Sequence, residues 1–422
     1  MVSPDIVFPL TVDSSAILLD GSYIAQSHKP KAVKTIGEYI ESTFVQLINK
    51  YLIHYGRVDL LFDRYFSDSI KNVTRNNRGD GGRFHIVSTT PIPRNWKTFM
   101  RNSENKTELF RLIAKYAENI IPPPDKQFIC TIDDKVVVCP PSVPTDNISP
   151  CTHEEVDTRI LLHARDAVTR GFTSLLLKAT DTDVVVVCLS LFEQIGAKCI
   201  WIEFGTSRNL RLLPIHEIHK SLGPARCRGL PFFHALTGCD TTTAFVGYGK
   251  VSAWNVWEEF EQEYTQVFSR VSFYSSVSDL SEDDIEMLET YVSSIYMKIK
   301  TFTRIDINDA RKKLFLTKGI SFDKLPPTKD VLYLKILRCM YQCFVWTNSL
   351  IKSPLLPSVQ NYGWKLDNDS LSFVWSTLPD IVKGCWDTFV KCNCKKSGCA
   401  KNCSCKRTGE PCTTLCGCNC YE

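Results

Sequence analysis

The first half of the chain alternates short apolar runs with segments whose apolar residues recur at helical spacing. The short runs have the length and the leucine, isoleucine and valine content of buried strands. Helical spacing is clearest over residues 36–55 and 105–119. This alternation predicts an α/β fold with a central, mostly parallel sheet flanked by helices. The predicted strands are residues 14–19, 58–62, 175–177 and 198–204, with a hairpin over residues 128–138.

Acidic residues follow apolar runs in five segments of the chain. If the strands are parallel, these residues meet at the edge of the sheet where ligands of open α/β sheets bind. Carboxylates gathered there would repel one another unless a cation lay among them, and oxygen ligands in this number suit Mg²⁺ or Mn²⁺. Two such ions about 3.5–4 Å apart catalyse phosphodiester hydrolysis. The acids are Asp20, Asp63, Glu155 with Asp157, Asp181 with Asp183, and Asp240.

Each acid also has a purely structural interpretation. Thr180 with Asp183, and Thr152 with Glu155, have the spacing of capping pairs at helix N-termini. The second pair would open a helix that ends near residue 170. Capping explains any one acid well but all five segments poorly, so the whole set favours metal binding.

Two segments with basic residues and glycines follow acids of this set. Lys71 and Arg75 come after Asp63, and Gly247, Gly249 and Lys250 come after Asp240. Glycines let backbone amides approach a phosphate closely, so either segment is a candidate phosphate-binding loop. A solvated, flexible loop is the alternative for the first segment.

The composition is that of an ordinary globular protein. The chain has 422 residues, of which 44% are hydrophobic and 23% charged, and this length predicts two or three domains. No run reaches the roughly 18 apolar residues of a membrane helix, and residues 1–10 lack the basic start of a secretion signal. We therefore expect an intracellular protein with no membrane partner.

Residues 391–422 differ from the rest in charge and in cysteine content. They carry six basic and two acidic residues, which accounts for the whole net charge of +4 and predicts a polyanion-binding tail. In an intracellular chain such clustered cysteines favour metal over the alternative, a disulfide knot. Three zinc ions with bridging thiolates would use all nine cysteines and supply folding energy. The cysteines are Cys392, Cys394, Cys399, Cys403, Cys405, Cys412, Cys416, Cys418 and Cys420, and the candidate phosphate contacts are Lys395, Lys396, Lys401, Lys406 and Arg407.

The ordered acidic segments resemble the motifs of the PIN-like, flap-endonuclease superfamily over about residues 14–255. The resemblance implies an α/β nuclease that uses two divalent metals, with the seven acids as metal ligands or their immediate supports. It also implies that Lys71 and Arg75 face the scissile phosphate. Gly247, Gly249 and Lys250 resemble the helix–turn–helix element that contacts the DNA backbone in flap endonucleases.

The tail resembles the tesmin-type CXC domain, a DNA-binding zinc cluster. The match covers residues 391–421 and starts with the spacing of Cys392, Cys394 and Cys399. Domains of this type read a minor groove with tyrosines, and Tyr421 is the tyrosine that follows the last cysteine here. The combination resembles animal proteins that join such a nuclease domain to a cysteine-rich tail, some of them derived from mobile elements.

Three regions and two alternative functions follow. We expect a nuclease domain over residues 1–255, a helical region of unknown role over 256–390 and a zinc-cluster domain over 391–422. The first function is a Mg- or Mn-dependent nuclease that acts by a two-metal mechanism in the nucleus. Its expected substrate is structured or single-stranded nucleic acid, DNA rather than RNA. The alternative is an inactive scaffold that binds DNA or chromatin through the tail.

Overall fold

The computed structural model describes most of the chain outside the N-terminus and the cysteine-rich tail. Among the described helices, none has both the length and the apolar character needed to cross a membrane. Arg75, Lys395, Lys396, Lys401, Cys420 and Tyr421 lie outside the described residues. The described residues are 14–66, 69–71, 82–205, 209–317, 321–367, 370–376, 391–394, 399, 403–409, 411–412, 416 and 418.

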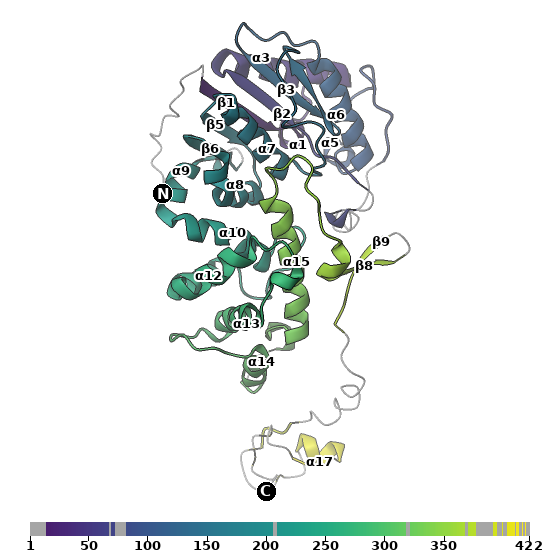
Figure 1. Cartoon of the computed structure of the whole chain (residues 1–422). Coiled ribbons are helices and arrows are strands. Elements are labelled where there is room, and N and C mark those ends of the chain that lie inside the picture. Colours follow the sequence, from purple (N-terminus) through teal and green to yellow (C-terminus); the bar gives the residue numbers. More distant parts are fainter. Residues whose placement is uncertain are drawn as a thin grey trace.

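A seven-stranded sheet forms one end of the molecule (Figure 1), with the strand order β4-β3-β2-β1-β5-β6-β7. The five central strands are parallel, and β4 and β7 are antiparallel edge strands. The prediction of a mostly parallel sheet is therefore confirmed. The strands are β1 Ser15–Asp20, β2 Arg57–Leu61, β3 Gln127–Ile132, β4 Lys135–Cys139, β5 Ser174–Lys178, β6 Cys199–Phe204 and β7 Arg211–Pro214.

Helices cover both faces of this sheet, and further helices extend away from it (Figure 1). The first group is α1 Gly21–Ser27, α2 Ile36–Tyr39, a π-helical turn Ile40–Val45, α3 Gln46–His54, α5 Trp96–Phe99 and α6 Ser103–Ala117. The second group is α7 Val156–Thr169, α8 Thr182–Ile195, α9 Ile215–Leu222 and α10 Pro224–Leu236. The remaining elements are α11 Lys250–Glu259, α12 Glu261–Val271, α13 Glu282–Met297, α14 Ile307–Phe315, α15 Lys329–Thr347, the hairpin β8 Trp364–Asp367 with β9 Ser370–Phe373, and α17 Ser404–Thr408. Short 3₁₀ turns are Val277–Asp279, Phe322–Lys324 and Val359–Tyr362.

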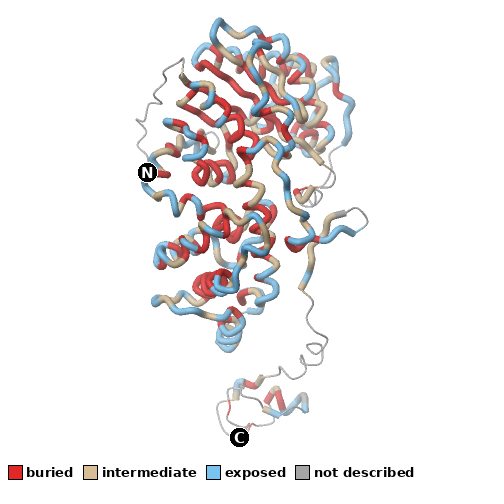
Figure 2. The backbone as a smooth tube through the Cα atoms, in the orientation of Figure 1, coloured by how far each residue is buried: buried red, intermediate tan, exposed pale blue. Residues whose placement is uncertain are grey.

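Alternate residues of β1 face opposite sides of the sheet, as strand geometry requires. Ile17 and Leu19 pack into one apolar cluster with the first group of helices, and Ala16 and Leu18 pack into a second cluster with α7, α8 and α10. All four side chains are fully buried, and the tube in Figure 2 shows mostly buried residues in the centre of the sheet. Burial of both faces explains why β1 and β5 appear in the sequence as unbroken apolar runs.

The second cluster continues from the sheet into the helices beyond α10. It includes Trp257 of α11, Tyr264 of α12, Tyr291 of α13 and Trp346 of α15, all fully buried. The domain boundary expected at residue 255 falls within this cluster. That boundary stays a prediction, but the packing on its two sides is continuous.

A return segment, residues 348–358, runs from the end of α15 back to the sheet (Figure 1). Its Lys352 carbonyl accepts a hydrogen bond from the Thr152 backbone N–H at 2.9 Å. Its Ile351 carbonyl accepts one from His153 Nε2 at 2.7 Å. The return segment thus fixes the two residues that come just before Glu154 and α7.

Two local predictions were wrong. The apolar run at residues 232–236 belongs to α10, so Asp240 follows a helix instead of a strand. Helix α7 begins only at Val156, and Thr152 bonds to the return segment, so Thr152 is not the residue that caps this helix. An apolar run of five residues suits a buried helix as well as a strand, which explains the first error.

Gly21, the first residue after β1, gives a test of how the fold supports this edge of the sheet. A Cβ atom at Gly21 would lie 2.6 Å from Cδ1 of Phe62, whose ring stacks on Phe110 with centroids 4.4 Å apart. We expect Gly21→Ala to lower the free energy of unfolding by about 1–3 kcal/mol, because overpacking displaces the Phe62 ring. Urea denaturation measures this change.

The matched control is Gly82→Ala, because the nearest atom to a Cβ there lies 3.9 Å away. Equal stability of the two variants would contradict the close packing of Gly21 against Phe62.

Candidate active site

Six acidic side chains line one cavity of about 630 Å³ at the carboxyl edge of the sheet. We call it the acidic cavity. Three of the acids lie at or just after the ends of the central strands β1, β2 and β5, two lie at the start of α7, and one follows α10. They are Asp20, Asp63, Asp181, Glu155, Asp157 and Asp240.

The register of the parallel strands explains why acids so distant in sequence meet. Asp20 pairs with Leu61 of β2, so Asp63 lies two residues beyond the level of Asp20. Leu19 pairs with Lys178 at the end of β5, and Asp181 follows three residues later. Parallel strands end at the same edge, so their following residues converge there.

Backbone N–H groups at helix starts hold several of these carboxylates in place. Asp20 Oδ1 accepts from the Tyr23 N–H at 2.9 Å, which caps α1, and Asp181 Oδ1 accepts from the Asp183 N–H at 3.0 Å, which caps α8. Asp63 Oδ1 accepts from the Val156 N–H at 2.9 Å, so Asp63, which follows β2, stabilises the start of α7. Capping and membership of the acidic cavity are therefore compatible.

Lys71 brings a positive charge to the acids. Its Nζ forms an ion pair with Glu155 and lies 3.9 Å from Asp240 Oδ2. Glu155 is the N-cap residue of α7, but its side chain makes no capping hydrogen bond. Burial would lower the pKa of Lys71, but Glu155 and Asp157 outweigh burial and raise that pKa above its usual range. Lys71 therefore stays protonated and offsets part of the negative charge.

Burial and mutual repulsion raise the pKa values of four acids. Burial, followed by the charge of Asp63, raises the pKa of Asp20 to about 7. Burial also raises the pKa of Glu155 to about 7, although Lys71 opposes the shift. Burial and Glu155 hold the pKa of Asp157 well above its usual value, and burial and Asp183 raise that of Asp181. A bound cation would offset this repulsion and favour the charged forms of the carboxylates.

Asp183 behaves differently from the six acids and does not line the cavity. Its Oδ1 lies 2.9 Å from Nε2 of His234, and both side chains are buried. Burial would raise the pKa of Asp183, but the hydrogen bond to His234 outweighs it and lowers the pKa. The sequence analysis missed His234, because it lies in an apolar stretch 51 residues away in the chain.

Basic side chains line the acidic cavity beside the six acids, and the sequence analysis missed these as well. They come from the segment after α1, from α5 and the turn that follows it, and from the start of α6. Three of them lie within a stretch of ten residues, and this clustering is the signal that could have identified them. We call this set the basic wall: Lys29, Lys97, Arg101 and Lys106.

Lys250 points into the protein. Its Nζ donates to the His234 carbonyl at 2.9 Å, to Thr237 Oγ1 at 3.0 Å and to the Gly238 carbonyl at 2.7 Å. Burial lowers the pKa of this amine to about 8. The geometry makes Lys250 a support for the loop that carries Asp240. Its expected contact with a DNA backbone stays a prediction, as do those of the exposed Gly247 and Gly249.

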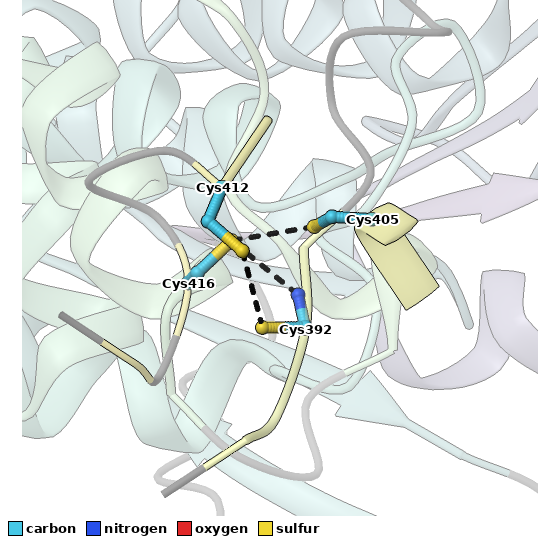
Figure 3. A group of neighbouring side chains, drawn as sticks. All are labelled: Cys392, Cys405, Cys412 and Cys416. Atoms are coloured by element: carbon cyan, nitrogen blue, oxygen red, sulfur yellow. Dashed lines mark hydrogen bonds between the residues drawn. The ribbon is translucent and has the colours of Figure 1, made fainter. Parts of the chain in front are cut away.

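The described cysteines of the tail face one another in three overlapping groups of four. Figure 3 shows one of them, in which Cys392, Cys405, Cys412 and Cys416 converge from α17 and the segments on either side of it. Cys392 belongs to all three groups, and its Sγ lies 3.4 Å from the Sγ of Cys418. The other groups are Cys392, Cys399, Cys412 and Cys418, and Cys392, Cys394, Cys399 and Cys403.

Of the expected phosphate contacts in the tail, Lys406 and Arg407 lie within the described residues. Both are exposed on α17. Lys406 Nζ donates to the Cys399 carbonyl at 2.7 Å, so it also ties α17 to the cysteine cluster.

The structure is similar to solved nucleases of the class that the acidic motifs resemble. One is a flap endonuclease of bacteriophage T5 with DNA and metal ions, at 11% identity and a TM-score of 0.36, covering 77% of this chain and 99% of that chain. Two structures of the Rad2 catalytic core with DNA substrate match at 14% and 16% identity, with TM-scores of 0.37 and 0.31. They cover 78% and 76% of this chain, and 95% and 93% of the Rad2 chains. No protein-family model and no curated protein matches the sequence. These similarities are weak, so the functional conclusion depends on the geometry of the acidic cavity.

The raised pKa values predict how stability depends on pH when divalent ions are chelated. The folded protein holds more protons than the unfolded chain between about pH 4 and 7, so stability falls as pH rises through this window. We expect Asp20→Asn to raise the Tm by at least about 2 °C at pH 8 and to raise it much less near pH 4, where the carboxyl group is largely protonated in the folded protein and about half protonated in the unfolded chain. Thermal denaturation in EDTA measures both values.

The matched control is Asp125→Asn, an exposed acid outside the acidic cavity in a left-handed conformation that asparagine tolerates. An equal effect of both substitutions at pH 8 would contradict the strain assigned to Asp20.

Proposed function

We propose that this protein is a metal-dependent nuclease that hydrolyses phosphodiester bonds of DNA in the acidic cavity. The observation that carries the proposal is the convergence of six carboxylates, of which four have pKa values that burial and like charge raise. Such a set is unstable without protons or cations, and hard divalent cations prefer carboxylate oxygens.

The donor set fits Mg²⁺ or Mn²⁺. Asp20, Asp63, Asp157, Asp181 and Asp240 would hold the ions, with Glu155 shared between the ions and Lys71. Two bound ions supply Lewis acidity and a water of lowered pKa at neutral pH. The carboxylates therefore serve as ligands and do not act as general bases.

The protein's own side chains perform the remaining tasks. Lys71 keeps its proton and places a cationic donor among the acids, where a phosphate oxygen gains negative charge during hydrolysis. The hydrogen bonds from Tyr23, Val156 and Asp183 to the carboxylates fix the ligand oxygens before substrate binds. Pre-organised ligands of this kind avoid reorganisation during the reaction.

The basic wall supports a polyanionic substrate. Its four cationic side chains line the same cavity as Tyr23, Tyr65 and Trp96. Phosphates can therefore pair with the charges and bases can stack on the rings. Cationic grooves with aromatic rings are typical of single-strand binding, because phosphates pair with the charges and bases stack on the rings. A single-stranded or unpaired stretch of DNA is the substrate that this cavity suits.

The cysteine tail is proposed as a zinc cluster that binds DNA in the nucleus. Three overlapping groups that share Cys392 suit three zinc ions with bridging thiolates. The excess positive charge of the tail would add affinity for the phosphate backbone that falls as salt concentration rises.

The nuclease proposal is tested with flap, hairpin and single-stranded DNA and with matching RNA, in Mg²⁺ or Mn²⁺. We expect Asp181→Asn to lower the cleavage rate by at least about 10²-fold, because it removes a metal ligand but keeps the cap on α8. Single-turnover rates on labelled substrates measure the loss.

Asp125→Asn, which changes an acid outside the cavity, should cleave at the wild-type rate. Absence of cleavage by the wild type, or equal cleavage by Asp181→Asn, would overturn the proposal. The substrate panel also decides between DNA and RNA.

The zinc proposal predicts about three zinc ions per chain and an unequal effect of two cysteine substitutions. Cys392→Ser should remove two or more ions, because Cys392 belongs to all three groups, whereas Cys394→Ser should remove at most about one. Elemental analysis of the purified full chain measures zinc content.

Cys199→Ser, which alters a half-buried cysteine of β6, is the control and should leave the zinc content unchanged. Fewer than about three ions in the wild type, or equal losses in Cys392→Ser and Cys394→Ser, would count against the cluster.

A further inference from the structure

A second cavity of about 360 Å³ adjoins the acidic cavity. Lys71 and Glu155 line both cavities, so their ion pair forms the partition between them. The second cavity lies between the segment after β2, the start of α7, helix α15 and the return segment. A group bound there would be adjacent to whatever occupies the acidic cavity.

The lining of the second cavity suits a flat, uncharged group. Phe66, Tyr341, Val345 and Leu356 provide aromatic and aliphatic surface. The charged residues that line it are Lys71, Glu154 and Glu155, so negative charge exceeds positive charge and a phosphate is disfavoured.

Neighbouring residues hold the two aromatic rings of this lining. The Arg64 guanidinium lies 4.7 Å from the centroid of the Phe66 ring, and Arg64 Nη1 donates to the Cys151 carbonyl at 2.8 Å. The ring of Tyr341 packs against Tyr362 and Trp364, at centroid distances of 5.4 and 5.6 Å. Fixed rings lose little entropy when a ligand packs on them.

A side-chain amide adds hydrogen-bonding capacity. Thr241 Oγ1 donates to Gln342 Oε1 at 2.6 Å, so the orientation of the Gln342 amide is set and its NH₂ group is the donor that remains for a ligand. A carbonyl or ring nitrogen is the matching acceptor. Apolar pockets of this size with one or two convergent polar groups are typical of small-ligand sites.

We propose that the second cavity takes one nucleobase of the substrate, next to the phosphodiester that is cut. The inference rests on the proposed nuclease function and adds to it a determinant of where the strand is cut. A base is planar, carries acceptors for Gln342 and stays attached to the phosphate that enters the acidic cavity. Nucleic-acid enzymes place unstacked bases in pockets of this kind, where stacking and edge hydrogen bonds stabilise them.

The test uses the full chain and DNA substrates with one abasic site, placed in turn at each position beside the cleaved bond. In the wild type, one abasic position should lower the single-turnover rate at subsaturating enzyme by about 5- to 100-fold. In Phe66→Ala the intact substrate should be slowed to a similar degree, and the abasic site should then have little further effect. This non-additivity identifies a direct contact between the base and the pocket.

Two further variants keep the test independent of folding defects. Leu356→Ala changes a residue that lines the cavity and is 47% exposed. This variant should have the wild-type Tm, and the abasic site should slow its cleavage less than it slows cleavage by the wild type. Phe84→Ala removes a phenylalanine outside the cavity and should retain the full abasic effect of the wild type. An abasic effect that is equal in the wild type, Phe66→Ala and Leu356→Ala would overturn the inference and leave the nuclease function standing.

Absence of cleavage by the wild type would overturn the proposed function instead. In that case equilibrium binding of intact and abasic single strands still tests the cavity. Equal affinities of the wild type for both strands would overturn the inference, whereas weaker binding of the abasic strand by the wild type, and not by Phe66→Ala, would support it.

Discussion

The site depends on one constraint, which is that several carboxylates of like charge are held together in a buried space. The acidic cavity gathers carboxylates that would separate if the chain were free, and Lys71 offsets only part of their repulsion. What keeps them together is the packing of β1 on both faces, through Ile17 and Leu19 on one side and Ala16 and Leu18 on the other. The free energy of the two cores thus maintains an arrangement that is unfavourable by itself. The ligands of a site of this kind are pre-organised before any cation binds.

Much of the fold could be predicted from the sequence, because strands such as β1 and β5 are buried on both faces and appear as unbroken apolar runs. The convergence of Asp20, Asp63 and Asp181 also follows from the sequence, since parallel strands end at one edge. Asp240 joins them from a helix, and five apolar residues do not distinguish a helix from a strand. That these acids bind metal stays a prediction.

Other parts of the site depend on contacts between distant segments that no local pattern records. The partner of Asp183 is His234, a histidine in an apolar stretch, and this pair separates Asp183 from the acids that line the cavity. The basic wall combines a cluster of three basic residues over 97–106 with Lys29, which packing brings to the same cavity from another part of the chain. Lys250 follows two glycines as a phosphate-binding lysine would, yet it bonds to three protein oxygens. Tertiary packing decides each of these roles.

The return segment connects two parts of the chain whose proposed tasks differ. Its carbonyls at Ile351 and Lys352 hold the backbone and side chain just before Glu154, and the chain continues from it through β8 and β9 towards the cysteine tail. The start of α7, and with it Glu155, is therefore tied to the end of α15 through contacts that bypass the sheet.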